Sequence, residues 1–107
     1  MLDLKPEHLA MVQRILAERI PFAQVWAFGS RVAGSAKKFS DLDLAIDAGR
    51  ELSFLEMANL REDFQESDLP MSVDLVDLRS VKLAFRKLVE GQRVLVSASE
   101  KDLSTRS

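Results

Sequence analysis

The stretch that decides the fold is Phe28–Ile46, which reads FGSRVAGSAKKFSDLDLAI. An apolar run ends at its first residue, Gly29-Ser30 breaks that run, and Asp41 and Asp43 open a second apolar run. On a strand over 41–47 the side chains alternate between two faces, so the two carboxylates share one face and the leucines beside them point into a core. Two carboxylates about 7 Å apart along one strand are suited, as oxygen ligands, to a hard cation such as Mg²⁺.

The composition is that of one small globular domain. The 107 residues are 47% hydrophobic and 30% charged, which is ordinary for a globular chain with one modest core. We therefore expect a single domain over 1–97 and a polar C-terminal tail over 98–107. The net charge of −2 provides no basic field that would attract nucleic acid or an anionic membrane, so no direct nucleic-acid contact is expected.

Several absences narrow the class of protein. The chain has no cysteine, which excludes a thiolate metal site and a thiol nucleophile. Its first residues, MLDLKPEH, lack the basic start and apolar core of a signal peptide. No apolar run approaches the roughly 20 residues that are needed to span a bilayer. These features predict a cytoplasmic protein without a membrane contact.

Apolar periodicity and turn residues predict four strands that alternate with helices. Ser30 is expected to cap a short helix, and Gly91 to end the last helix as the residue just after it. The expected helices cover 5–20, 31–37, 53–64 and 79–90, and the expected strands cover 22–28, 41–47, 71–78 and 93–97. This alternation predicts an α/β (α+β) fold in which helices cover a small sheet.

The positions of the polar residues predict the direction of two strands. Gly29-Ser30 follows the C-terminal end of the first strand, whereas Asp41 and Asp43 lie at the N-terminal end of the second. If both groups serve one site, these two strands run antiparallel. We therefore expect a mixed sheet that carries the site on one face.

These residue types indicate phosphate chemistry. A strand that ends in Gly-Ser before a helix places unpaired backbone amides at an anion, and Ser30 adds a hydroxyl donor. Opposite Asp41 and Asp43, this arrangement is suited to a triphosphate bridged by Mg²⁺. Asp74, central in the third expected strand, is the candidate third carboxylate. With three carboxylates, two metal ions can act on the attacking and leaving oxygens of an in-line displacement. Asp74 can also accept the proton of the attacking hydroxyl.

Each of these features alone also has a purely structural explanation. A Gly-Ser pair is commonly a turn and a helix cap, an Asp-x-Asp pair is commonly a solvated strand edge, and Asp74 can be an exposed strand residue. Trp26 and Phe28 are expected in the core rather than as a platform for a nucleotide base. The combination of the features, not any single one, points to a function.

The combination Gly29-Ser30-Arg31-x-x-Gly34-x5-Ser40-Asp41-x-Asp43-Leu44 resembles the signature of the DNA polymerase β-like nucleotidyltransferase superfamily. Within it, nearly the whole chain is similar to the small prokaryotic minimal nucleotidyltransferase (MNT) proteins. The resemblance implies a nucleotidyltransferase fold with ATP as substrate. It departs from the family form at Ala33, where a second arginine is common, so one basic contact is missing.

The resemblance also assigns roles to residues. It implies that the nucleotide is bound by Gly29, Ser30, Arg31 and Ser40. It implies that two Mg²⁺ ions are held by a catalytic triad of Asp41, Asp43 and Asp74.

MNT proteins commonly pair with a small helical HEPN protein, a ribonuclease toxin, and act as its antitoxin. The resemblance therefore implies AMP transfer from ATP to a hydroxyl of the toxin, that of a tyrosine, within a heteromeric complex or by a homodimer. Two alternatives stay open at this point. The chain can neutralise its partner by occlusion alone, or it can transfer a nucleotide to a small hydroxylated molecule such as an aminoglycoside. The sequence does not indicate which nucleotide base is preferred.

Overall fold

A computed structural model describes residues 2–37 and 40–98, and the predicted tail falls outside these residues except for its first residue. The described elements form one four-stranded sheet in the order β3-β2-β1-β4 with helices around it. In chain order they are α1 (Pro6–Arg19), β1 (Gln24–Phe28), α2 (Ser30–Ala33), β2 (Leu42–Asp47), α3 (Phe54–Gln65), β3 (Val73–Asp77), α4 (Leu83–Glu90) and β4 (Val94–Ser97). Within this part of the chain, no helix has the length and apolar character needed to cross a membrane.

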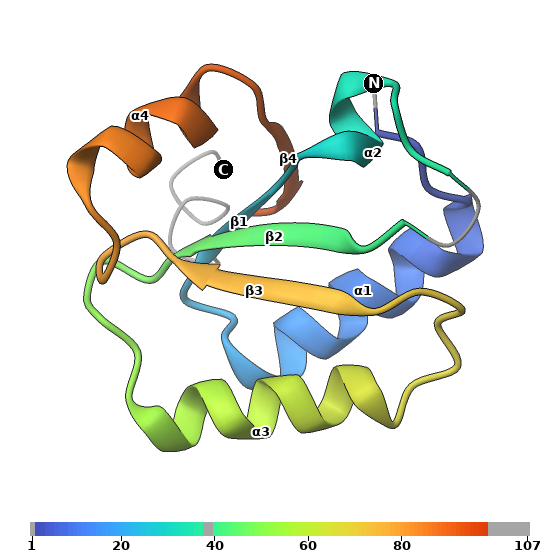
Figure 1. The fold of residues 1–107 in the computed structure, drawn as a ribbon. Coiled ribbons are helices and arrows are strands. Elements are labelled where there is room, and N and C mark those ends of the chain that lie inside the picture. The colour runs from blue at the N-terminus through green and yellow to red at the C-terminus, as the bar shows by residue number, and fades with distance from the viewer. Residues whose placement is uncertain (1, 38–39, 99–107) are drawn as a thin grey trace, which may run out of the picture.

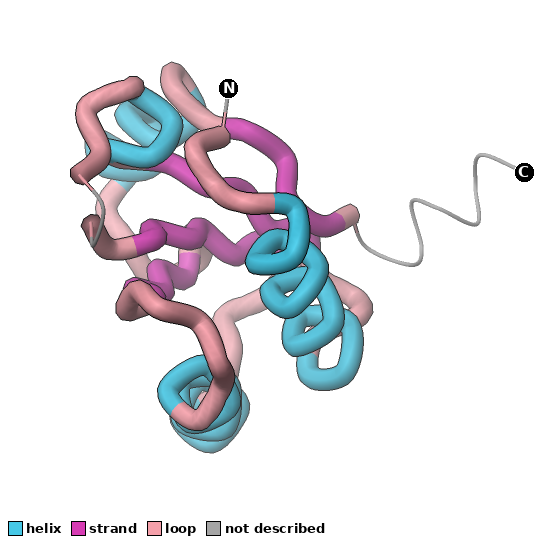
Figure 2. The backbone as a smooth tube through the Cα atoms, turned by 90° about the vertical axis from the view of Figure 1, so that its right-hand side faces the viewer, coloured by secondary structure: helices cyan, strands magenta, loops and turns pink. Residues whose placement is uncertain are grey.

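The main core lies between one face of the sheet and the helices α1 and α3 (Figures 1 and 2). Leu42, Leu44 and Ile46 of β2 are fully buried in it, as the alternation of side chains predicts. α1 contributes Val12 and Leu16 to the same core.

The opposite face of the sheet is covered only in part. α4 packs there through a small second cluster that contains Ala45, Leu78 and Val89 and is flanked by Trp26 and Phe28. The expectation that these two aromatic residues belong to a core is therefore met in part, because both remain partly exposed. The rest of this face is free to carry polar side chains.

Strand directions confirm the predicted mixed sheet. β1 and β2 are antiparallel and place Phe28 opposite Asp43, whereas β2 and β3 are parallel and place Asp43 beside Asp74. β4 joins the other edge of β1 in antiparallel orientation. The end of β1 and the start of β2 consequently lie together, next to the start of β3, where Asp74 is the second residue rather than the central one that was expected.

Local hydrogen bonds explain where α3 and α4 begin. Ser53 and Glu56 form a reciprocal capping box at the start of α3. α4 begins four residues later than predicted, because the Asp77 carboxylate accepts a hydrogen bond from Arg79 N and the Ser80 hydroxyl donates to Asp77 O. These side-chain contacts form a turn that competes with helix.

The predicted start of α2 needs correction, whereas the predicted end of α4 does not. Gly91 directly follows the last residue of α4, as expected, and has a right-handed backbone with φ −74°. Ser30 is the first residue of α2 rather than its cap, because Gly29 occupies the cap position. α2 ends at Gly34, whose φ of 82° places it in the left-handed region that glycine tolerates.

Candidate functional site

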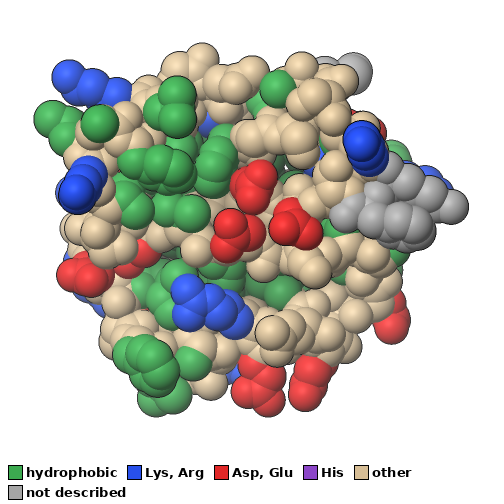
Figure 3. Space-filling view, viewed as in Figure 1, with side chains coloured by type: hydrophobic (Ala, Val, Ile, Leu, Met, Phe, Trp, Pro, Cys, Tyr) green, Lys and Arg blue, Asp and Glu red, His purple; other side chains and the backbone are tan. Residues whose placement is uncertain are grey.

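The three predicted carboxylates lie on the sheet face that α4 covers incompletely. Asp41 precedes β2 and is exposed, Asp43 is half-buried within β2, and Asp74 is exposed in β3. The parallel pairing of β2 with β3 places Asp43 and Asp74 side by side. In Figure 3 a group of acidic side chains lies near the centre of the view, beside apolar side chains over α4. The structure therefore places the three carboxylates on one face of the sheet and makes Asp43 and Asp74 direct neighbours.

The electrostatics of this group favour a bound cation. Burial raises the pKa of the Asp43 carboxyl, and the nearby negative charges of Asp74 and Asp41 raise it further. In the described part of the chain, none of the three forms an ion pair with lysine or arginine. A hard divalent cation would relieve this uncompensated repulsion, and carboxylate oxygens are the ligands that Mg²⁺ prefers.

The carboxylates do not by themselves form a closed metal cage. No three acidic or histidine side chains among residues 2–37 and 40–98 are gathered closely enough to hold a metal ion. The donor types fit Mg²⁺, but further oxygen ligands are needed to complete its coordination. Mg²⁺ commonly takes such ligands from water and from substrate phosphates.

The Gly-Ser turn meets the carboxylates through Gly29. Its backbone has φ 79° and ψ −153°, a combination that is nearly restricted to glycine. A Cβ atom at this position would overlap Oδ2 of Asp43. The close approach shows that the backbone at the end of β1 lies directly against the Asp43 carboxylate.

α2 is a single turn of helix that follows Gly29. The backbone amides of Val32 and Ala33 both donate to Gly29 O, at 3.0 and 2.9 Å. The first amides of a helix have no partner within that helix. Ser30, the first residue of α2, holds such a position directly after the Gly29 turn.

Arg31 is placed differently from the expectation that it contacts a nucleotide. It is buried, and its guanidinium donates to the backbone oxygen of Ser40 from Nε at 3.0 Å and from Nη2 at 2.8 Å. Its Nη1 donates to Asp3 O at 3.0 Å. These contacts tie α2 to the N-terminal segment and to the residue just before Asp41.

Ser40 also supports the backbone in this structure. Its hydroxyl oxygen accepts a hydrogen bond from Lys37 N at 2.8 Å, and its own amide donates to Lys37 O at 3.1 Å. Sequence reasoning missed this supporting arrangement around Asp41. No local sequence pattern indicates these contacts, because Arg31 donates to backbone oxygens, one of which lies 28 residues away in the sequence.

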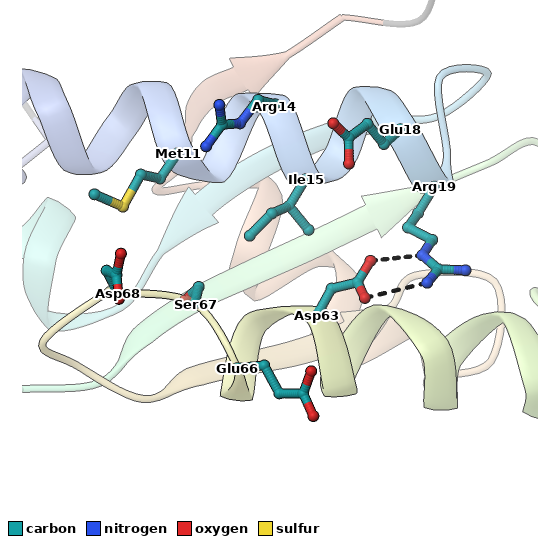
Figure 4. A pocket seen from close by; sticks show the side chains of 9 residues that line it. All are labelled: Met11, Arg14, Ile15, Glu18, Arg19, Asp63, Glu66, Ser67 and Asp68. Carbon is teal, nitrogen blue, oxygen red and sulfur yellow. Dashed lines mark hydrogen bonds and ion pairs between the residues drawn. The ribbon is translucent and has the colours of Figure 1, made fainter.

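The carboxylates lie outside the cavity between α1 and α3. A cavity of about 590 Å³ lies between α1 and α3, and the ion pair between Arg19 and Asp63 bridges it (Figure 4). Its lining carries both signs of charge and contains none of the predicted site residues. Asp41 and Asp74 instead face solvent on an open surface.

The sequence matches a known protein family over most of its length. A family model described as polymerase beta nucleotidyltransferase matches residues 11–101. The chain belongs to the polymerase β nucleotidyltransferase family. This nucleotidyltransferase is 49% identical to the probable protein adenylyltransferase MntA of Haemophilus influenzae strain Rd. The alignment covers 94% of this chain and 88% of the relative.

Solved structures give the same fold for this nucleotidyltransferase. A crystal structure of a toxin–antitoxin with AMP-PNP superposes with a TM-score of 0.73 and 28% identity, covering 88% of this chain and 76% of that one. A MntA–HepT toxin–antitoxin structure superposes with a TM-score of 0.68 and 25% identity, covering 92% and 76% of the two chains. The predicted nucleotidyltransferase fold with a mixed sheet is confirmed.

Proposed function

We propose that this nucleotidyltransferase transfers AMP from ATP to a hydroxyl, most suitably that of a tyrosine, on a HEPN toxin, and so acts as the toxin's antitoxin. The observation that carries the proposal is the meeting of three elements at one place: Asp43, its parallel neighbour Asp74, and the Gly29 turn against it. The 49% identity to a probable protein adenylyltransferase supports this assignment.

The proposed roles follow from the placement of each group. Asp41, Asp43 and Asp74 would hold up to two Mg²⁺ ions together with phosphate oxygens of ATP. The metal supplies neutralising charge to the phosphates. The backbone at Gly29 and Ser30 would bind the triphosphate.

The transfer step is an in-line displacement. The acceptor hydroxyl oxygen forms a bond to the α-phosphorus of ATP, and the bond from that phosphorus to the pyrophosphate oxygen breaks. Asp74 is the exposed carboxylate that β3 places beside Asp43, and it would accept the hydroxyl proton. Pyrophosphate leaves with the electron pair of the broken bond.

An open site suits a protein acceptor. The carboxylates lie on an exposed surface, and the described chain folds into one sheet with its helices. A small hydroxylated acceptor would need walls that enclose it, since small-molecule sites bury most of their ligand. A protein acceptor brings its own surface to cover the reacting groups.

Labelling with α-labelled ATP tests the proposal. Purified protein and Mg²⁺ are added to an extract of the source cells, beside the Asp41→Asn/Asp43→Asn variant. The matched control is Asp68→Asn, which alters an exposed carboxylate at the cavity between α1 and α3. One labelled protein is expected with wild type and control and not with the double variant.

Other results contradict the proposal in different ways. Equal labelling by the double variant would show that these carboxylates do not carry the transfer. If the double variant neutralises the toxin without any nucleotide, occlusion rather than transfer is the function. A labelled small molecule in place of a protein would assign the acceptor to the small hydroxylated class.

A further inference from the structure

An amphipathic helix beside the site presents most of its apolar side to solvent. At about 100° per residue, Ala84, Leu88, Phe85 and Val89 of α4 fall within about 140° of one side of the helix. Val89 is 2% exposed, whereas Phe85 is 37% and Leu88 is 70% exposed. The domain therefore buries only one edge of the apolar side of α4, and Ala84 and Leu88 remain exposed.

The exposed apolar side continues into the candidate site. The ring of Phe85 meets the ring of Phe28 edge to face, with centroids 6.0 Å apart and planes at 84°. Phe28 is the strand partner of Asp43. We call Phe28, Val81, Ala84, Phe85 and Leu88 the α4 patch. Figure 3 shows apolar side chains over α4 next to the central acidic group.

The charge around the α4 patch differs from that of the rest of the chain. Residues 79–93 contain five basic residues and one acidic residue, a net charge of +4 in a chain whose total is −2, so the remainder carries −6. Arg86 lies within ion-pair distance of Asp47 and Glu90. Lys82 and Lys87 form no ion pair with any described residue, and both are exposed.

We propose that the α4 patch is the surface on which the acceptor toxin docks, through an apolar and acidic area of the toxin surface. The inference rests on the proposed function, since it assigns the surface that presents the acceptor hydroxyl to Asp43 and Asp74. An apolar centre with a charged rim is the usual anatomy of a protein interface. The contiguity of the patch with the carboxylates places a docked protein next to the reacting groups.

The same patch is poorly suited to a nucleotide base. Stacking needs an open aromatic face, and in the perpendicular contact of Phe28 with Phe85 the edge of one ring covers a face of the other. Leu88 projects from the helix surface and is largely exposed. A ridge of this kind fits a groove on another protein better than it fits a planar base.

The test compares Leu88→Glu with Leu55→Glu. Leu55 is 66% exposed, close to the exposure of Leu88, but it lies on α3, on the opposite side of the sheet from α4 (Figure 1). Both variants replace an exposed leucine on a helix, so both are expected to fold. Lys87→Glu tests the charged rim separately.

Three quantities are measured for each protein: the Kd for the purified HEPN toxin of the same organism, the KM of AMP transfer to that toxin, and the Kd for a non-hydrolysable ATP analogue with Mg²⁺. Leu88→Glu is expected to raise the toxin Kd and KM about tenfold or more, with the Kd for the analogue unchanged. Lys87→Glu should raise the toxin Kd less and mainly through slower association. Leu55→Glu should match the wild type.

Each contrary outcome overturns the docking assignment or the proposed function separately. An unchanged toxin Kd in Leu88→Glu, or an equal loss in Leu55→Glu, overturns the docking surface. A loss of analogue binding in Leu88→Glu does so as well, because the patch would then contact nucleotide. If the wild type binds the toxin but transfers no AMP, the proposed function fails while the toxin Kd values still decide the surface.

Discussion

Replacing Gly29 with alanine should destabilise the domain through two separable effects. The backbone at Gly29, φ 79° and ψ −153°, costs a non-glycine residue about 1–3 kcal/mol. The added methyl group would also overlap the Asp43 carboxylate, and an overpacked contact of this kind costs about 1–3 kcal/mol more. We therefore expect Gly29→Ala to lower the free energy of unfolding by about 2–6 kcal/mol in total.

Urea unfolding followed by circular dichroism measures this loss, and two further variants separate its causes. Gly34 also has a positive φ, 82°, but a Cβ there meets no atom within 4 Å, so Gly34→Ala should lose only about 1–2 kcal/mol. In the Asp43→Ala background the carboxylate is absent, and Gly29→Ala should cost only its backbone part. The difference between the two backgrounds is the coupling energy of the pair.

The reasoning would be refuted by either of two results. If Gly29→Ala lowers the free energy of unfolding no more than Gly34→Ala does, the Asp43 contact adds no cost. A coupling energy near zero between Gly29→Ala and Asp43→Ala would show that the turn does not press on the carboxylate.

Three other predictions follow from single groups. Burial and the neighbouring carboxylates raise the pKa of Asp43, so ionising this group lowers the stability of the fold as pH rises above its unfolded-state pKa of about 4. Asp43→Asn should therefore be more stable than wild type at pH 7 in metal-free buffer, and this gain should be absent below pH about 4. Equal stability of the two proteins at pH 7 would contradict this. Arg31→Met should lower the free energy of unfolding by about 2–4 kcal/mol, because three hydrogen bonds from a charged donor are removed. Its kcat should be lower, with little change in the KM for ATP. A raised KM alone would indicate that Arg31 contacts the nucleotide directly. A hydrogen bond from Arg50 and others from Ser53 lower the pKa of Glu56 from 4.5 to about 2. The stabilising contribution of the ionised Glu56 is therefore present above pH about 4.5 and is lost as pH falls towards 2. Over this range the urea midpoint should fall less in Glu56→Gln than in wild type.

The spacing of residues predicted much of the site. Asp41 and Asp43 are separated by one core leucine, and Asp74 stands between Val73 and Leu75, so strand alternation alone assigned all three to the face away from the main core. The mixed sheet followed from the need to bring Gly29-Ser30 to the same place. The roles of Arg31 and Ser40 were not predictable in this way, because their partners are backbone atoms.

Helix boundaries were predicted where the signal is local and missed where contacts compete. The capping box of Ser53 and Glu56 agrees with the expected start of α3. α4 starts late because Asp77, whose carboxylate also accepts from Leu52 N at 2.8 Å, holds the preceding residues in a turn. A contact 25 residues away in the sequence leaves no trace in helical periodicity.

The sequence by itself determined the ligand types, the face on which each carboxylate lies, and the position of the glycine turn, because strand alternation and glycine backbone freedom are local properties. Only the tertiary structure decided that β3 runs parallel to β2 and places Asp74 beside Asp43. It also decided how α4 is rotated, so that Val89 is buried and Leu88 faces solvent. Periodicity defines an apolar side of a helix, but which part of that side is covered depends on packing between segments that are distant in sequence.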